Sequence, residues 1–558
     1  MNLSKLPIAD CRLPIADCRL PIADCQLPIA NCRFIYVKRR ANKLAIGNRK
    51  SAMGRWVLAA TILASSMAFI DGTVVNVALP FLQTNLNATA IGIQWVVEAY
   101  SLFLSALLLV GGSLGDLYGR RFIFNIGVVV FAISSAGCGL AANIEQLIIA
   151  RSVQGIGGAL LVPGSLALIS SSFNEKERGK AIGTWSGFSA ITTAIGPVLG
   201  GWLVEHWSWR AAFFLNLPLA VAVLVISLSK VPETREKNRS SGLDWLGAAL
   251  ATIGLGGVVY GLIESPRLGF RNPFVLLTLI GGLVALAAFV FNEAHTRNPM
   301  VPLSLFRIRD FAGANVLTLF LYAALSGMLF FFTLNLIQIQ GYSATAAGAA
   351  LLPFVVLMFS LSRWSGGLID RFGARLPLTI GPTIAAAGFI LFAVPSLSGN
   401  YWTSFFPAVL VLGLGMSISV APLTTTVMTA VGEEQAGVAS GINNAVSRTA
   451  GLLAIAVFGV VMLHAFSRQL VNRMDEIQVD EQLKHSIYEQ RVKLAALEVP
   501  ANADAGTREQ VKKVVADSFV FGFRVIMFTA AGLALASGAS SWFIIRRSGV
   551  GKPKHQGN

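Results

Sequence analysis

The chain has 558 residues, of which 54% are apolar and only 13% are charged, and its formal net charge is +16. Roughly a quarter of the residues of a soluble globular protein are charged, so this composition excludes a soluble domain, which would lack the polar surface that keeps it dissolved. The basic excess would suit a nucleic-acid partner, but the basic residues lie between long charge-free segments. We therefore assign them to membrane topology and expect no nucleic-acid partner.

Residues 1–52 form an extension that differs from the rest of the chain. Residues 6–33 are four tandem copies of a heptad, LPIADCR with small changes, and they hold four of the five cysteines: Cys11, Cys18, Cys25 and Cys32. The proline in each copy rules out a continuous helix, and a seven-residue spacing without histidine matches no usual metal-ligand pattern. The segment also lacks the apolar core of a signal peptide. We favour a dispensable extension, with Met53 as the true start, over a redox or metal-binding role.

Beyond Met53, apolar segments follow one another to the C-terminus. About 20 apolar residues cross a bilayer as a helix, and a helix satisfies its own backbone without water. The sequence therefore predicts an all-α polytopic membrane protein. Fourteen transmembrane helices are expected, at about 56–79, 92–112, 122–141, 146–171, 181–203, 211–229, 243–263, 274–292, 312–337, 344–362, 376–396, 403–425, 436–463 and 519–545.

The basic residues orient these spans. With the N-terminus inside, the short internal loops carry fifteen Lys and Arg residues, and the short external loops carry three, Arg210, Arg267 and Arg271. This asymmetry follows the positive-inside rule, so both termini are predicted to be cytoplasmic, including the tail 546–558. The hydrophilic stretch 464–518 is then an external hairpin, which could serve as a lid, a docking arm or a linker.

A ten-residue repeat divides the chain into two related parts. The segment 112–121 (GSLGDLYGRR) follows the second span, and the segment 366–375 (GGLIDRFGAR) follows the tenth. Repeated six-span halves are typical of secondary transporters, but here the copies are eight spans apart. The sequence therefore predicts an N-terminal six-helix half at 53–230, two inserted helices with linkers at 231–300, and a C-terminal six-helix half at 301–545.

Charged residues within predicted spans are costly and usually mark an ion or substrate path, and the candidates here are Asp71, Glu98, Arg151 and Arg448. Asp71, Glu98 and Arg151 are expected at a similar depth, on the order of 10 Å below the outer surface. Two acids and one base in one layer could exchange partners as a proton comes and goes. A static buried ion pair is the alternative, and Glu98 could instead neutralise a cationic substrate. Arg448 is a further candidate, although it could snorkel or cap a helix.

At this point the sequence resembles the major facilitator superfamily, and more narrowly its fourteen-span drug:proton antiporters of the EmrB/QacA type. The two ten-residue copies resemble the superfamily's loop signature, and 71–80 (DGTVVNVALP) and 151–159 (RSVQGIGGA) resemble first-span and fourth-span motifs of the fourteen-span family. The segment 196–201 (GPVLGG) is similar to the fifth-span motif of antiporters, which implies export.

The resemblance assigns roles to individual residues. The loop residues are expected to form a cytoplasmic gate, which involves Gly112, Asp116, Gly119, Arg120, Arg121, Asp370, Gly373 and Arg375. Ala374 stands where the first copy has Arg120, so the second loop should latch less tightly. In the antiporter motif, Gly196, Gly200 and Gly201 should allow close helix packing, and Pro197 should let the helix bend.

Together these features predict a proton-coupled multidrug exporter of the bacterial inner membrane, which expels small hydrophobic or cationic compounds by alternating access. A dedicated exporter of one endogenous metabolite is the alternative, and a non-transporting receptor or a membrane enzyme is less favoured. No metal-ligand cluster, nucleotide-binding loop or nucleophile–base pair is recognisable, so we expect no enzyme activity, no metal and no cofactor. The expected partners are a small-molecule substrate, protons, the lipid bilayer and, as a further candidate, a periplasmic adaptor protein. Aromatic residues could line a cavity for flat apolar compounds: Phe69, Trp95, Tyr100, Trp185, Tyr322 and Phe330–Phe332.

Overall fold

The computed structural model describes residues 29–173, 175–235, 244–395, 400–432, 435–477, 479–500 and 503–546. The chain divides into two compact units, Met1–Arg55 and Trp56–Asn558, and the second unit holds the apolar helices. Residues 1–28, which contain most of the heptad repeat, lie outside the described residues. That the extension is dispensable therefore stays a prediction.

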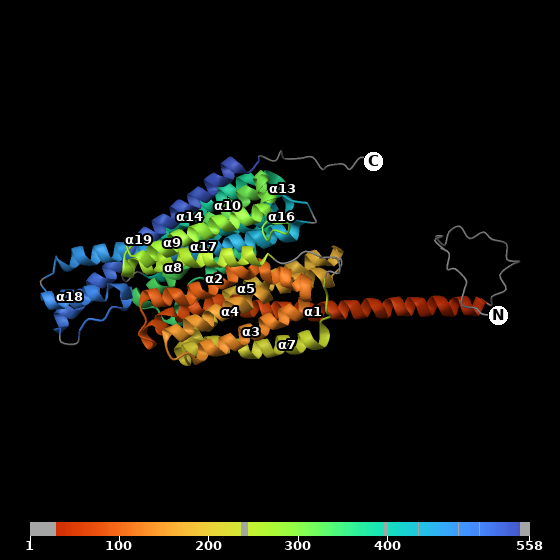
Figure 1. Ribbon diagram of the computed structural model, residues 1–558, viewed down its shortest axis with the longest axis horizontal. Helices are drawn as coiled ribbons and strands as arrows, with labels where there is room; N and C mark the ends of the chain where they lie inside the picture. Colours follow the sequence, from red (N-terminus) through yellow and green to blue (C-terminus); the bar gives the residue numbers. More distant parts are fainter. Residues whose placement is uncertain are drawn as a thin grey trace. The chain divides into compact units, whose positions relative to one another are not determined.

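Fourteen helices in the described part of the chain are long and apolar enough to cross a membrane, which confirms the predicted fold class. Figure 1 shows the helices of the unit 56–558 running side by side. The first helices are α1 (Ile29–Asn85), α2 (Ala90–Tyr118), α3 (Arg120–Leu140), α4 (Ile144–Ser172), α5 (Glu175–His206), α6 (Trp209–Phe214) and α7 (Asn216–Lys230). The next two are α8 (Trp245–Leu268) and α9 (Pro273–His295). The remaining elements are η1 (Leu303–Arg307), α10 (Arg309–Leu334), η2 (Asn335–Ile339), α11 (Ala344–Ala349), α12 (Leu352–Gly366), α13 (Leu368–Phe372), α14 (Arg375–Phe392), α15 (Tyr401–Ser404), α16 (Phe406–Thr429), α17 (Ala436–Met474), α18 (Glu481–Glu489), η4 (Arg491–Ala496) and α19 (Ala505–Ile544).

The two ends of this helical unit differ. One end, called the hairpin end here, carries the segment 475–504 between α17 and α19, with α18 and η4 within it. The other, called the motif-loop end, carries the repeated loops 112–121 and 366–375. Short polar caps begin helices at the hairpin end: the side chains of Thr89, Asn143 and Ser343 accept hydrogen bonds from the first-turn amides of α2, α4 and α11. Such caps satisfy amides that would otherwise lack a partner, so the turns between spans stay short.

The helices beside the hairpin extend beyond the predicted spans, and the external position of 464–518 stays a prediction. Helix α17 continues to Met474 and α19 already begins at Ala505. The reason is amphipathic spacing: Phe466, Leu470 and Met474 recur every four residues and are fully buried, so they extend one apolar stripe of α17 beyond the charge-free segment. The hairpin proper is therefore the segment 475–504.

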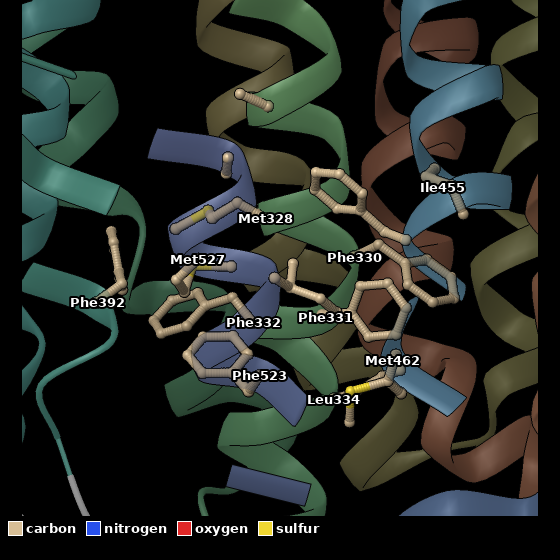
Figure 2. Close-up of a cluster of buried hydrophobic side chains, with 14 of the residues drawn as sticks. Met328, Phe330, Phe331, Phe332, Leu334, Phe392, Ile455, Met462, Phe523 and Met527 are labelled. Carbon is tan, nitrogen blue, oxygen red and sulfur yellow. The ribbon is translucent and has the colours of Figure 1, made fainter. Parts of the chain in front are cut away.

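Phenylalanines of α10 divide between two directions. The Phe332 ring packs at 4.9 Å from Phe392 and 5.4 Å from Phe405, within the core of the C-terminal helices. Figure 2 shows Phe330 and Phe331 on the other side of α10, near Ile455 and Met462 of α17. The expected aromatic cavity is therefore not formed by these three residues together, because Phe332 is a core residue.

The pair α8–α9 packs beside α2 and α17. A small apolar cluster joins Ile91, Leu102 and Ala106 of α2 to Leu255, Val259 and Ile263 of α8 and to Leu452 and Ala456 of α17. Helix α9 packs on α8 and buries only four of its residues, so most of its surface is left for lipid. Because the residues after Arg55 form one compact unit, the division into halves and an inserted pair stays a prediction.

Candidate functional site

Asp71 of α1 and Arg151 of α4 form an ion pair in the interior of the helical unit. The Arg151 Nη1 atom lies 2.5 Å from Asp71 Oδ2, and both side chains are almost completely buried. Gln154 and Asn216 donate to Asp71 Oδ1 at 2.9 and 3.2 Å, and Arg151 Nε donates to the carbonyl of Val96 at 3.1 Å. The Asp71 carboxylate therefore accepts hydrogen bonds from three side chains, which hold it in place.

Polar and aromatic side chains surround the Asp71–Arg151 pair. Asn216 at the start of α7 also donates to Ser135 Oγ at 3.0 Å, and the Tyr100 ring covers the Arg151 guanidinium with 4.2 Å between its centre and Cζ. Sequence reasoning missed Asn216 and gave Gln154 no role. A signal for Asn216 existed, because it is a polar residue inside the charge-free segment of the sixth span.

Glu98 is also completely buried, but the structure does not bring it to the Asp71–Arg151 pair. Tyr100 and Leu104 of α2 contact Gly158 of α4, whereas Ile91 and Leu102 of α2 pack toward α8 and α17. Glu98 is seven residues after Ile91 and four before Leu102, so it shares their face, and it is rotated by about 200° from Tyr100. The pair and Glu98 therefore lie on opposite sides of α2, and no exchange of partners among the three occurs in this arrangement.

Neither carboxylate oxygen of Glu98 has a hydrogen-bond partner among the described residues. Its neighbour Trp95 packs against the apolar cluster and donates from Nε1 to Glu264 of α8 at 3.2 Å. Glu264 is in turn paired with Arg267 at 2.9 Å. The two acids near Trp95 are thus unequal: Glu264 is neutralised by a cation, and Glu98 is not.

Arg448 lies in α17 and is partly exposed. In the part of the chain that the structure describes, it has no hydrogen bond and no ion pair, whereas Asn443 nearby donates to Asn315 and Thr318 of α10 at 3.2 and 2.7 Å. Arg448 is therefore not joined to the Asp71–Arg151 pair. Helix α17 itself is anchored to α10 beside it.

Glutamines link α1 and α2 to the C-terminal helices at the hairpin end. Gln83 donates to the carbonyl of Lys493 in η4 at 3.1 Å and accepts from Gln338 at 2.9 Å. Gln94 of α2 donates to the carbonyl of Ile455 in α17 at 2.9 Å. A cavity of about 30 Å³, large enough for one water molecule, is lined by these three glutamines and by Phe330 and Phe331, among others.

The antiporter-motif residues of α5 pack against two different helices. A Cβ on Gly196 or Gly200 would overlap Thr73 or Val74 of α1, and a Cβ on Gly201 would lie 2.4 Å from the carbonyl oxygen of Ala344 in α11. From the other side, a Cβ on Gly348 would lie 2.2 Å from the carbonyl oxygen of Pro197. Only glycine permits such an approach of backbones.

Glu205 reinforces this contact at the end of α5. Its carboxylate accepts from the amide and the hydroxyl of Thr345 and so caps α11 from a different part of the chain. Beside the contact, a cavity of about 90 Å³ is lined by residues of α1, α5, α10, α11 and α12, including Thr73, Asn76 and Thr193. It lies between the N-terminal and C-terminal helices.

At the motif-loop end, the first loop is held by the linker after α7. Asp116 pairs with Arg120 at 2.8 Å, and Gly119 adopts φ 117°, which favours glycine. Glu233 of the linker accepts from the amides of Arg121 and Phe122, each at 3.0 Å, and so caps the first turn of α3. Arg121 Nη1 donates to the carbonyl of Val231 at 3.0 Å. The capping by Glu233 was not foreseen from the sequence.

The second loop is arranged differently. Gly373 again has positive φ, 72°, but Arg375 lies over the Trp542 ring with its Cζ atom 4.1 Å from the ring centre. Among the described side chains, Asp370 forms no ion pair corresponding to that of Asp116. A Cβ on Gly112 would lie 3.7 Å from Pro163 of α4, which is an ordinary contact distance. Among the described residues, no group of three or more His, Cys, Asp and Glu side chains is arranged to hold a metal ion.

Comparisons with known proteins agree with this architecture. The chain is 36% identical over 438 residues to the multidrug resistance protein Stp of Mycobacterium tuberculosis (strain CDC 1551 / Oshkosh), which covers 77% of this chain and 80% of that protein. It is 32% identical over 499 residues to the tetracenomycin C resistance and export protein of Streptomyces glaucescens, covering 87% and 90%. Among solved structures, a bacterial homolog of the human lysosomal transporter Spinster matches with a TM-score of 0.60 at 20% identity, over 88% of this chain and 97% of the other. The model of the Major Facilitator Superfamily matches residues 61–455, and the chain is therefore a multi-pass membrane transporter that belongs to this superfamily.

Proposed function

We propose that the protein is a proton-coupled drug exporter that works by alternating access in a bacterial inner membrane. The similar proteins of Mycobacterium tuberculosis and Streptomyces glaucescens are named for multidrug resistance and for tetracenomycin C export. The single observation that carries the proton-coupled part is Glu98, a completely buried carboxylate without a partner among the described residues. A transmembrane acid in this state is costly to ionise and is suited to bind and release a proton.

Of the two acids in this layer, Glu98 and not Asp71 is the proton carrier in this proposal. Asp71 is held by Arg151, Gln154 and Asn216, so protonating it would sacrifice a buried ion pair. Glu98 loses no partner when it takes a proton. It also lies beside the contact of α2 with α17, which joins the N-terminal to the C-terminal helices. A change in that contact during the transport cycle would expose Glu98 and allow it to release the proton.

The orientation follows from the charges in the loops. We place the hairpin end outside and the motif loops with both termini inside, because the basic residues concentrate in the loops of the motif-loop end. The contacts of Gln83, Gln94 and Glu205 with the C-terminal helices all lie at the hairpin end. They would close the outer side in this arrangement and must break when that side opens. A periplasmic adaptor protein stays a prediction.

The test is transport in proteoliposomes that contain the purified full-length protein. Substrate-loaded vesicles are followed with and without an imposed pH gradient, over a panel of chemically unrelated antibiotics and dyes. We expect gradient-dependent movement of several unrelated compounds. Movement of one compound alone would support the alternative, an exporter dedicated to one metabolite, and transport that ignores the gradient would contradict proton coupling.

A further inference from the structure

Arg448 occupies the side of α17 that faces α2. Gly441, seven residues earlier, would place a Cβ 3.5 Å from Leu109 of α2, and Leu452, four residues later, belongs to the cluster shared with α2. Ala445 packs against the cluster that contains Tyr100. Because residues three, four and seven apart share a helix face, Arg448 lies in the same stripe. It therefore stands at the boundary between the N-terminal and C-terminal helices.

Structural roles do not account for this arginine. It is twelve residues beyond the start of α17, about 18 Å along the helix axis, which is too far for its side chain to reach the membrane surface. It caps no helix end, because α17 continues to Met474. An unpaired cation inside a membrane protein is costly and usually marks a substrate or ion path.

The nearby acids are not available to Arg448. Asp71 is already paired with Arg151, and neither carboxylate oxygen of Glu98 has a partner among the described residues, so Glu98 is not bound to Arg448. Asn443 and Asn444 are engaged with α10 and with the carbonyl of Ser440. Across the boundary, the stripe of α17 that contains Arg448 faces the apolar cluster that holds Tyr100. Among the described residues, no acid therefore forms an ion pair with Arg448.

We propose that Arg448 recognises an acidic oxygen of the substrate, so that the exporter takes aromatic or otherwise apolar compounds that carry a carboxylate or a phenolate. A guanidinium offers five N–H donors in a planar fork that matches such oxygens. The inference rests on the proposed export function and narrows it. It also replaces the expected preference for cations with a preference for anions, because the unpaired charge at the boundary is a guanidinium.

The test uses two dyes that share a xanthene core and differ in charge: fluorescein, which is anionic, and rhodamine 123, which is cationic. Gradient-driven transport of each dye is measured in proteoliposomes for the full-length wild type, Arg448→Gln and Arg448→Lys. We expect the wild type to transport fluorescein faster than rhodamine 123. In Arg448→Gln, the rate of fluorescein transport should fall on the order of tenfold or more, because a hydrogen bond to a charged group is lost. Rhodamine 123 transport should stay within about twofold of the wild type, and Arg448→Lys should recover part of the fluorescein transport.

A matched control is Arg468→Gln, which makes the same change at an exposed position of the same helix. This variant should transport both dyes at the wild-type rate. An equal fall in the transport rates of both dyes in Arg448→Gln would overturn the inference. It would indicate that Arg448 is a partner of Glu98 or has a packing role. A wild type that moves rhodamine 123 but not fluorescein would also overturn it while leaving the export function intact. If the wild type moves neither these dyes nor any compound of the wider panel, the export function itself fails.

Discussion

Gly201 of α5 and Ala344 of α11 approach so closely that a Cβ on Gly201 would lie 2.4 Å from the Ala344 carbonyl oxygen. The two residues come from the N-terminal and C-terminal helices, so the contact closes the hairpin end. Gly201→Ala should hinder this closure, because the atom in the way belongs to the backbone. Overpacking of this kind costs about 1–3 kcal/mol, and we expect the transport rate to fall roughly tenfold.

Gly187→Ala is the matched control for this prediction. Gly187 lies in the same helix, and nothing lies within 4 Å of a Cβ placed there. Its variant should transport at the wild-type rate. Equal rates for Gly201→Ala and the wild type would show that closure does not depend on this approach.

Asp71→Asn and Arg151→Ala should each destabilise the fold. Removing one member of a buried ion pair leaves the other charge without a partner, which costs about 3–5 kcal/mol. Thermal unfolding of the purified variants in detergent measures the effect, and we expect clearly lower midpoints for both. The double variant Asp71→Asn/Arg151→Gln should recover part of the loss, because no unpaired charge remains. Unchanged midpoints for the single variants would contradict the buried pair.

Glu98→Gln should fold normally and lose its coupling to protons. The substitution removes no hydrogen bond, because neither carboxylate oxygen has a partner among the described residues, and the amide cannot carry a proton. Transport driven by a pH gradient should disappear in proteoliposomes, whereas exchange of substrate down its own gradient should continue. Glu264→Gln is the control, since that acid is already paired with Arg267. If Glu98→Gln shows gradient-driven transport at the wild-type rate, the proton carrier is Asp71 or another acid and not Glu98.

Asp116→Ala should impair transport while leaving expression largely intact. Asp116 and Arg120 form a partly exposed pair across the turn between α2 and α3, and such a pair contributes little to stability. Its effect should appear in the equilibrium between conformations.

Glu233→Ala should have a similar effect and should also loosen the start of α3, because it removes the cap, at a cost of about 1 kcal/mol. The control for both variants is Glu489→Ala, at an exposed position of the hairpin. Transport at the wild-type rate in Asp116→Ala would remove the gate from the mechanism.

Deletion of residues 1–52 should leave insertion and transport intact. The apolar helices belong to the compact unit Trp56–Asn558, and every candidate span begins at or after Met53. The measurement compares the membrane-inserted amount and the transport rate of the shortened and the full-length chains. A loss of either in the shortened chain would assign a role to the heptad repeat.

The sequence alone was sufficient for the membrane class, the number of spans and the family. Charge-free segments of about 20 residues leave the backbone no alternative to helix in lipid, so composition and spacing decide the element type without knowledge of packing. The repeated loops were recognisable because their glycines adopt a positive φ that the local backbone requires, as at Gly119 and Gly373. The lengths of α17 and α19 were underestimated, because their amphipathic ends contain charges that the span criterion treats as loop.

The tertiary structure decided which charges meet. Depth along a helix can be counted from the sequence, and on that count Asp71, Glu98 and Arg151 were equivalent members of one layer. Rotation about each helix axis depends on the packing of neighbouring helices, and the glycines of α4 that contact Tyr100 and Leu104 turn Glu98 to the opposite side of α2. For the same reason, the pairing of Asp71 with Arg151, the capping of α3 by Glu233 and the unpaired state of Arg448 follow from helix–helix contacts that no local pattern in the sequence specifies.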